Sequence, residues 1–283
     1  MTKRQFTTTE IDSSYWRITF SNGDINLMDA DTLEQLAELV AAIEQAPDLK
    51  VVVFDSANPD YFIAHWDVFA DTDRVGAMAP GPTGLHPYID NFVRLSRVPA
   101  VTISAIRGRA RGAGSEFALA TDIRFAGHKA ILGQFEVGVG AVPGGGAMTR
   151  LARLVGRARA MEIVLGSEDV PAEVAERIGY VNRTVPDAEL DAHVDAFARR
   201  IAGFEKHAVA GAKKFIDEAT LPDDNSVFAA GLNAFFQSAG RSESVARIAA
   251  LLERGFQQPD GVERDLGRHV AEYRADATVT EKN

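Results

Sequence analysis

Residues 98–124 carry more information about the architecture of this chain than any other stretch, and they are VPAVTISAIRGRARGAGSEFALATDIR. Residues 100–106 form a continuous apolar run of the kind that is buried on both faces of a parallel sheet. Three glycines follow within residues 108–114, then a short segment of small and apolar residues, and then a second strand-like run near residues 122–126. This alternation of strand and helix patterns predicts an α/β protein.

The same alternation continues on both sides of this stretch. Towards the N-terminus, residues 30–45 repeat Leu and Val at the spacing of an amphipathic helix. Three further runs are strand-like, and they cover residues 16–20, 51–55 and 130–132. Residues 71–85 hold three Gly and two Pro without any period, which is typical of a long functional loop.

The C-terminal third has a different pattern. Strand signals end near residue 186, and helical patterns then fill the chain to about residue 273. We therefore predict an α/β core over residues 1–200 and a helical C-terminal region over residues 201–283 that covers the core or contacts other subunits. The last residues, 275–283, are predicted to form an irregular tail.

The composition excludes several functions. With 30 Lys and Arg against 40 Asp and Glu, the formal net charge of the 283 residues is −10, and no basic patch for nucleic acid is present. The absence of Cys removes disulfide frameworks, zinc ribbons and thiol nucleophiles together. The N-terminus has no apolar segment typical of a signal peptide, and no apolar run reaches the ~18 residues of a membrane span. We predict a cytoplasmic protein that binds neither nucleic acid nor membranes.

Two isolated glutamates are the strongest chemical signal. Glu116 is the only charged residue within residues 112–121, and Glu136 is the only one within residues 130–149. Because removing a lone carboxylate from water is costly, burial raises its pKa towards the neutral range that general acid–base catalysis needs. Two such groups facing one cavity could hold a water molecule and move its protons. The alternative for either residue is a solvent-facing position or a helix cap.

Glycines surround both carboxylates, and they stand at positions 112, 114, 138, 140, 144, 145 and 146. Because Gly lets the backbone approach a ligand closely, this favours one site over two unrelated caps. The small residues before Glu116 are suited to the start of a short helix, whose free N–H groups would stabilise negative charge on a substrate oxygen. A nucleotide cradle is the competing interpretation. However, neither G-x-G-x-x-G in its strand–helix context nor G-x-x-x-x-G-K-[ST] is present.

Other catalytic classes are disfavoured by the motifs. The six histidines have no H-E-x-x-H or other close metal-binding spacing, so we predict no metal site, and no G-x-S-x-G elbow of a serine hydrolase is present. His65 is typical of a packed histidine, with a site-lining position as the alternative, and Trp66 is typical of a core residue. Arg107, Arg109 and Arg111 alternate as on one face of an extended segment, which favours solvated or paired side chains over a phosphate site.

Three blocks carry a family resemblance: residues 61–67 (YFIAHWD), 98–124 and 132–155. They resemble, in this order, the segments F-[SA]-A-G-A-D, K-P-V-I-A-A-V-N-G-x-A-x-G-G-G-x-E-L-A-L-A-C-D-I-R and F-G-x-P-E-x-x-x-G-x-x-P-G-x-G-G-T-x-R-L-x-R of the enoyl-CoA hydratase/isomerase (crotonase) family. The resemblance implies a crotonase-like spiral of β-β-α units followed by helices. It also implies assembly into homo-trimers or hexamers.

Carried over position by position, the resemblance implies catalytic roles for Glu116 and Glu136, whose separation of 20 residues matches the family's hydratases. It places the oxyanion hole at the backbone N–H groups of Ala64 and Ala113. The residues that would contact an acyl-CoA thioester are Ile63, Ala64, His65, Trp66, Asp67 and Gly112. Glu116 would deprotonate water for attack on the β-carbon, and Glu136 would protonate the α-carbon. No cofactor is implied beyond the coenzyme A of the substrate.

The sequence also departs from the family pattern near these positions. His65 and Trp66 replace a glycine and a small residue, Ala113 replaces the middle glycine of G-G-G, and Phe135 replaces the proline before the second glutamate. These changes indicate a divergent branch whose substrate need not be a simple fatty enoyl thioester. Hydration of an α,β-unsaturated acyl-CoA is the favoured activity. The alternatives are a family isomerase, hydrolase or decarboxylase, and a non-catalytic binding or assembly protein.

Overall fold

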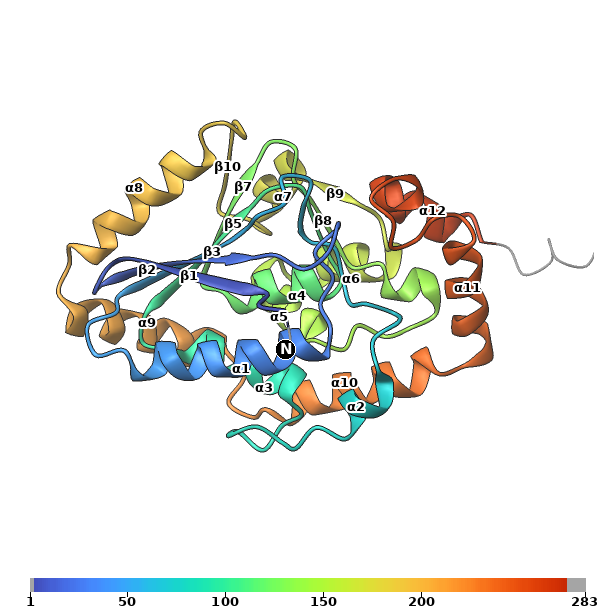
Figure 1. Ribbon diagram of the computed structural model, residues 1–283, viewed down its shortest axis with the longest axis horizontal. Coiled ribbons are helices and arrows are strands. Elements are labelled where there is room, and N and C mark those ends of the chain that lie inside the picture. Colours follow the sequence, from blue (N-terminus) through green and yellow to red (C-terminus); the bar gives the residue numbers. More distant parts are fainter. Residues whose placement is uncertain (1–2, 274–283) are drawn as a thin grey trace, which may run out of the picture.

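Two sheets form the framework of the chain in a computed structural model, which describes residues 3–273 (Figure 1). Within these residues the larger sheet has six strands, in the spatial order β1 (Phe6–Asp12), β2 (Tyr15–Phe20), β3 (Val51–Ser56), β5 (Val101–Ile106), β7 (Ile123–Gly127) and β10 (Arg183–Val185). β1 is antiparallel to β2, and every other pair in this sheet is parallel. The predicted tail, residues 275–283, lies outside the described residues.

The smaller sheet consists of short strands that follow strands of the larger sheet in the chain. Its spatial order is β4 (Tyr61–Ile63), β6 (Arg109–Arg111), β8 (Ile131–Gly133) and β9 (Val170–Pro171). β3, β5 and β7 are each followed by one of these strands and then by helical structure, so the chain advances as a spiral. The predicted β-β-α spiral is confirmed.

Helices follow each turn of the spiral. In the first part of the chain they are α1 (Ala30–Gln45), α2 (Thr72–Gly76), α3 (Pro87–Arg97), α4 (Ala113–Ala120), the 3₁₀ helix η1 (Glu136–Val139), α5 (Ala147–Leu154), α6 (Arg157–Gly166) and α7 (Ala172–Ile178). α1 begins with a capping box, in which the Asp29 side chain accepts from the Thr32 N–H and the Thr32 side chain accepts from the Asp29 N–H. Its predicted bounds are confirmed.

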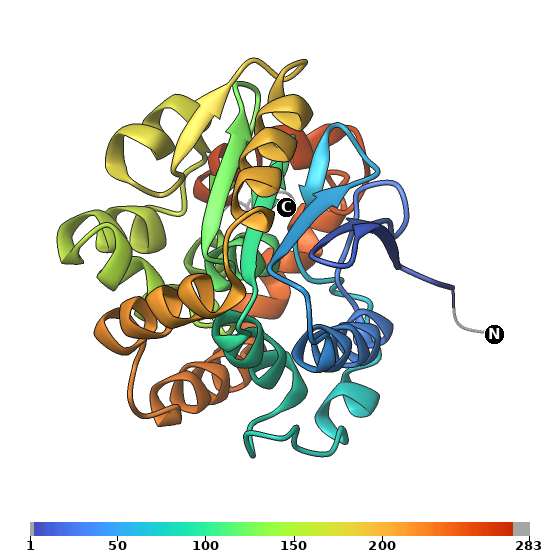
Figure 2. The same cartoon turned by 90° about the vertical axis from the view of Figure 1, so that its left-hand side faces the viewer.

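The larger sheet separates two apolar layers. Buried side chains of α1, α3 and α4 pack on one face, and α8 (Leu190–Ala202) crosses the other face (Figure 2). Leu190, Val194 and Ala198 of α8 pack with Val51 and Ile103 of the sheet. The strands at the centre are therefore covered on both sides, which is why they consist of continuous apolar runs.

The remaining helices follow α8 and extend around the framework. They are α9 (Lys206–Thr220), α10 (Ser226–Ala239), α11 (Ser242–Leu252), the 3₁₀ helix η2 (Gly261–Asp265) and α12 (Leu266–Ala271). α9 and α10 run along the lower side in Figure 1, and α11 and α12 stand at its right-hand side. Among residues 3–273 none of the helices combines the length and apolarity needed to cross a bilayer. The boundary between residues 200 and 201 stays a prediction.

Two short elements lie in segments that the sequence singled out. Residues 71–85 contain α2, a single short helix in the predicted loop. Arg109 and Arg111 lie on the three-residue strand β6, and the prediction of paired side chains is confirmed for Arg111, which binds Asp169 through two hydrogen bonds of 2.6 Å. The extended segment that the alternating arginines predicted is therefore present at residues 109–111.

Candidate active site

The start of α4 lies against the end of β4 because glycines permit close backbone contact. Gly112 precedes the helix with a φ of 47°, a conformation that favours glycine. A Cβ on Gly114 would lie 1.9 Å from the carbonyl oxygen of Ile63. The chain reaches the same place from β6, where the Arg111 N–H donates to the Ala64 carbonyl at 3.2 Å. Two segments that are about 50 residues apart in sequence therefore meet, as the predicted oxyanion hole requires.

Glu116 lies in the first turn of α4, and both of its carboxylate oxygens have donors. Oε1 accepts from the Gly145 N–H at 2.6 Å and from the Ala147 N–H at 3.3 Å, and Oε2 accepts from the Tyr88 hydroxyl at 2.8 Å. The side chain is buried, and burial raises its pKa, while these hydrogen bonds and the charge of Arg150 act in the opposite direction. A solvent-facing position for Glu116 is therefore wrong.

Glu136 begins η1 and has a different environment. It is also buried, and its Oε1 lies so close to Gly112 that a Cβ there would be 2.8 Å away. Its Oε2 has no hydrogen-bond partner among the residues that the structure describes. Burial, and then the negative charge of Glu116, raise the pKa of Glu136 well above its ordinary value.

The two carboxyl groups thus have different hydrogen-bond partners, although burial raises the pKa of both. Glu116 has the donors that stabilise an ionised carboxylate, whereas Glu136, with an unpartnered oxygen beside a second negative charge, favours the protonated form. Two neighbouring acids whose pKa values are driven apart form a base and an acid in one site.

The two predicted oxyanion donors differ in availability. The N–H of Ala113 belongs to the first turn of α4, and the described residues offer it no acceptor. The N–H of Ala64 instead donates to the Asn26 carbonyl at 3.1 Å and to the Ile25 carbonyl at 3.3 Å. The backbone at Asn26 has a φ of 56°, which forms the turn that brings these carbonyls to β4. In this conformation Ala113 alone has a free N–H of the two.

Of the two aromatic residues after Ala64, Trp66 packs against Tyr88, the residue that donates to Glu116. Trp66 is half-buried, and its ring packs edge-on against Tyr88 with centroids 5.6 Å apart. Tyr88 in turn donates to Glu116. Trp66 is therefore joined to the site through one aromatic contact.

His65 lies in a buried aromatic cluster beside Glu263, and its predicted contact with a ligand stays a prediction. Its ring is 1 % exposed, stacks on Phe256 at 4.6 Å, and packs edge-on against Phe135. Nε2 lies 2.8 Å from Glu263 Oε1, and Nδ1 lies 2.7 Å from the Trp66 carbonyl oxygen. The interpretation of His65 as a packed histidine is therefore confirmed for its ring, because these contacts enclose it.

Both ring nitrogens of His65 face acceptor oxygens, a carboxylate and a carbonyl. Each ring nitrogen lies within hydrogen-bond distance of one of these oxygens, so the ring connects Glu263 to the backbone at Trp66. Burial acts to raise the pKa of Glu263, but His65, the Gln257 N–H and Arg111 outweigh it and hold the pKa below its ordinary value. Asp67 joins the same cluster, because its Oδ1 accepts from Gln257 Nε2 at 2.8 Å.

The sequence placed Gly145 near the carboxylates but indicated no role for Tyr88 or Glu263. Gly145 donates to Glu116, and the glycine-rich surroundings of Glu136 were the signal for it. Tyr88 and Glu263 had no such signal. Each is one polar residue in an ordinary helical pattern, and only the fold brings Tyr88 to Glu116 and Glu263 to His65.

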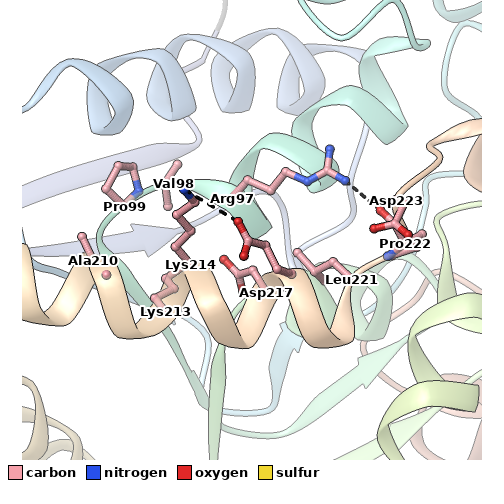
Figure 3. A pocket seen from close by; sticks show the side chains of 12 residues that line it. Arg97, Val98, Pro99, Ala210, Lys213, Lys214, Asp217, Leu221, Pro222 and Asp223 are labelled. Atoms are coloured by element: carbon pink, nitrogen blue, oxygen red, sulfur yellow. Dashed lines mark hydrogen bonds and ion pairs between the residues drawn. The ribbon is translucent and has the colours of Figure 1, made fainter.

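A surface pocket of about 600 Å³ lies elsewhere, between the end of α3 and α9 (Figure 3). Two of its charged side chains have partners: Lys214 lies 3.7 Å from Glu218, and Arg97 donates to the Pro222 carbonyl at 3.1 Å. The predicted catalytic residues are not among those that line it. The pocket is therefore separate from the candidate active site.

The packing at Gly145 predicts the effect of a single methyl group. A Cβ at this position would lie 2.1 Å from Glu116 Oε2 and 2.9 Å from the Tyr88 hydroxyl. In Gly145→Ala we expect a displaced Glu116 and a loss of turnover of about 10²-fold, since general-base catalysis needs hydrogen-bond reach. Gly166→Ala is the matched control, because nothing lies within 4 Å of a Cβ there. Equal turnover of the two variants would contradict this placement of Glu116.

Fold and site together define a class of protein: an α/β spiral that holds two buried carboxylates of unequal acidity beside a free helix N-terminus. A family model described as enoyl-CoA hydratase/isomerase matches residues 10–257. The chain belongs to the enoyl-CoA hydratase/isomerase family, and its spiral is the crotonase fold.

Relatives of this chain include a short-chain-enoyl-CoA hydratase from Clostridium acetobutylicum, which is 29% identical over 81% of this chain and 87% of that protein. Among solved structures, a Streptomyces avermitilis protein with a provisional enoyl-CoA hydratase assignment is 41% identical, with a TM-score of 0.90 over 96% of this chain and 98% of that one. A monofunctional enoyl-CoA isomerase from M. smegmatis is 26% identical, with a TM-score of 0.65 over 80% and 98%.

Proposed function

We propose that this enzyme hydrates an α,β-unsaturated acyl-CoA thioester. The observation that carries the proposal is the unequal pair of carboxyl groups, one hydrogen-bonded as a base and one unpartnered as an acid, beside the free Ala113 N–H. Addition of water needs both functions in one site, because one proton leaves the water and another reaches carbon. The similarity to short-chain enoyl-CoA hydratases supports the same assignment.

The residues would divide the work as follows. Glu116 takes a proton from water while the water oxygen bonds to the β-carbon, and the electrons of the double bond move towards the thioester carbonyl. The developing negative charge on that oxygen is met by the Ala113 N–H and the N-terminus of α4. Glu136 then gives its proton to the α-carbon, which completes the addition of H and OH.

The second oxyanion donor requires a change at β4. Because the Ala64 N–H already donates to the Asn26 carbonyl, it would serve the thioester only after exchanging that partner for the substrate. Of the predicted contact residues, Ile63 would border the start of α4, because its carbonyl oxygen lies close to Gly114, and Gly112 would border Glu136. Trp66 would border Tyr88, and Asp67 would support the site through its hydrogen bond to Gln257. His65 would contribute through its backbone.

Isomerisation of the enoyl double bond is the second candidate. An isomerase needs one carboxyl group to move a proton between carbons, and Glu136 has the raised pKa for that task. The similarity to an M. smegmatis isomerase adds to this case. The family's hydrolase and decarboxylase reactions would use the same oxyanion donor.

Purified protein mixed with crotonyl-CoA is the deciding assay, followed by the loss of the conjugated enoyl-thioester absorbance. We expect hydration by the wild type and a loss of about 10²-fold or more in Glu116→Gln, because the amide cannot take the proton of water. Full activity of Glu116→Gln on a 3-enoyl thioester, without hydration by the wild type, would establish the isomerase instead. No thermal stabilisation by any coenzyme A thioester would favour a non-catalytic binding or assembly protein.

The proposal extends to surroundings and partners. We propose that coenzyme A enters only as part of the substrate, with no metal or redox cofactor, that the enzyme works in the cytoplasm, and that it binds neither nucleic acid nor membranes. Assembly into trimers or hexamers is part of the same proposal. It is supported by large apolar side chains that α6 and α9 leave exposed, namely Leu165, Phe215 and Ile216.

A further inference from the structure

Tyr88 is a buried hydroxyl at the catalytic pair that the proposed mechanism does not use. It lies in the first turn of α3, and its oxygen donates to Glu116 Oε2 at 2.8 Å. Burial, and then the negative charge of Glu116, raise the pKa of Tyr88 well above its ordinary value. The phenol therefore keeps its proton and acts as a hydrogen-bond donor.

The hydrogen bonds of Glu116 determine which oxygen can serve a water molecule. A carboxylate oxygen has two lone pairs. On Oε1 both are directed to backbone donors, the Gly145 and Ala147 N–H groups. On Oε2 one lone pair accepts from Tyr88, and the second is free among the described residues. A water bound to Glu116 would therefore lie at Oε2, beside the Tyr88 oxygen.

The ring of Tyr88 is held in place by aromatic neighbours. Trp66 packs edge-on against it at 5.6 Å, and Phe92, one turn along α3, lies 5.1 Å away. Trp66 stands where the family pattern has a small residue, so the bulky side chain gains a role as a support for Tyr88. A tyrosine oriented in this way loses little further freedom when it binds the carboxylate.

We propose that Tyr88, supported by Trp66, is a positioning residue that directs Glu116 Oε2 at the attacking water and keeps Glu116 the ionised member of the carboxyl pair. The inference rests on the proposed hydration but concerns a contact that a one-carboxyl isomerase would not need. It also accounts for Trp66 as a support for the catalytic pair.

The charged and titratable groups that face Glu116 come from three elements. They are Tyr88 on α3, Glu136 on η1 and Arg150 on α5. Tyr88 is the one whose hydrogen bond can be deleted by removing a single oxygen atom while its ring stays in place. Tyr180 provides a comparison, because its buried hydroxyl binds the neutral Ser115 hydroxyl of the same helix α4.

The test is Tyr88→Phe, with Tyr180→Phe as the matched control. Loss of the phenol donor raises the pKa of Glu116, so its base form is lost at a higher pH as the solution is acidified. We expect the acidic limb of kcat/KM for crotonyl-CoA to move upwards by about one pH unit or more. KM should change little. The control should leave the limb unmoved, and an unmoved limb in Tyr88→Phe would overturn the proposal.

A second readout separates this inference from the proposed activity. The infrared band of the protonated Glu116 carboxyl, assigned by its loss in Glu116→Gln, can be titrated in both tyrosine variants without a substrate. An upward movement in Tyr88→Phe alone supports the positioning role even if crotonyl-CoA is not hydrated, in which case only the proposed function fails. Hydration by the wild type with the same titration in both variants would refute the role of Tyr88.

Discussion

Glu136→Gln is expected to lose hydration of crotonyl-CoA by about 10³ to 10⁴-fold, at the upper end of what one general acid supplies. The glutamine has nearly the same shape, and it carries no proton that it can give to the α-carbon. The same loss is expected for isomerisation, because both reactions pass a proton through this residue. The measurement is kcat at saturating substrate, so that a change in binding is separated from the chemical step.

The same variant should unfold with a weaker pH dependence. The folded pKa of Glu136 is raised above its ordinary value of 4.5, so the folded protein binds this proton more tightly than the unfolded chain does. Stability of the wild type therefore falls as pH rises from about 4.5 through the folded pKa, and Glu136→Gln removes that part of the loss. Calorimetry at several pH values measures it. An inactive variant with the pH dependence of the wild type would contradict the buried, raised-pKa environment of Glu136.

Glu263→Ala is expected to destabilise the fold by about 3 to 5 kcal/mol, the usual range for removing one partner of a buried ion pair. Glu263 is fully buried, and the change leaves His65 Nε2 and the Gln257 N–H without their shared acceptor. The pKa of Glu263 is lower in the folded protein than in the unfolded chain, so the ionised carboxylate stabilises the fold at pH values above its unfolded pKa. The wild type loses this stabilisation as the pH falls through the folded pKa. The difference between wild type and variant should shrink accordingly in acid.

A matched control lies in the same 3₁₀ helix. Arg264 pairs with Asp260 at 2.9 Å, and both side chains are well exposed. Arg264→Ala should cost no more than about 1 kcal/mol, since exposed pairs contribute little. Denaturant unfolding of the two variants, compared with His65→Ala and the double variant His65→Ala/Glu263→Ala, measures the coupling between His65 and Glu263. Equal, small losses in Glu263→Ala and Arg264→Ala would mean that the buried pair does not hold η2 to β4.

The helices and the long strands could be predicted from sequence because each has a local cause. The Leu and Val spacing of α1 and the apolar runs of β3 and β5 reflect burial of one face or of both faces, and this leaves a period in the chain. The pairing of the short strands β4 and β6 could not be predicted in this way. They lie side by side because residues that are distant in sequence pair in the fold, and this pairing leaves no period in the chain.

The same distinction between local and long-range causes applies to the candidate site. Glu116 and Glu136 could be singled out because a lone charge in apolar, glycine-rich sequence is an anomaly that needs no structure to detect. The difference between their environments could not be predicted from the sequence. The Tyr88 hydroxyl and the Gly145 N–H reach Glu116 from α3 and from the loop before α5, and the contrast with the unpartnered oxygen of Glu136 arises only when these elements pack together.

By itself, then, the sequence determined the α/β class, the order of the main elements and the two carboxyl groups, because these depend on local composition and spacing. The tertiary structure decided the direction of each side chain after Ala64. His65 is buried beside Glu263, whereas Trp66 packs against Tyr88. Adjacent residues could be separated in this way because their environments come from distant parts of the chain, and a hydrogen bond or an ion pair forms between atoms that folding has brought within about 3 Å.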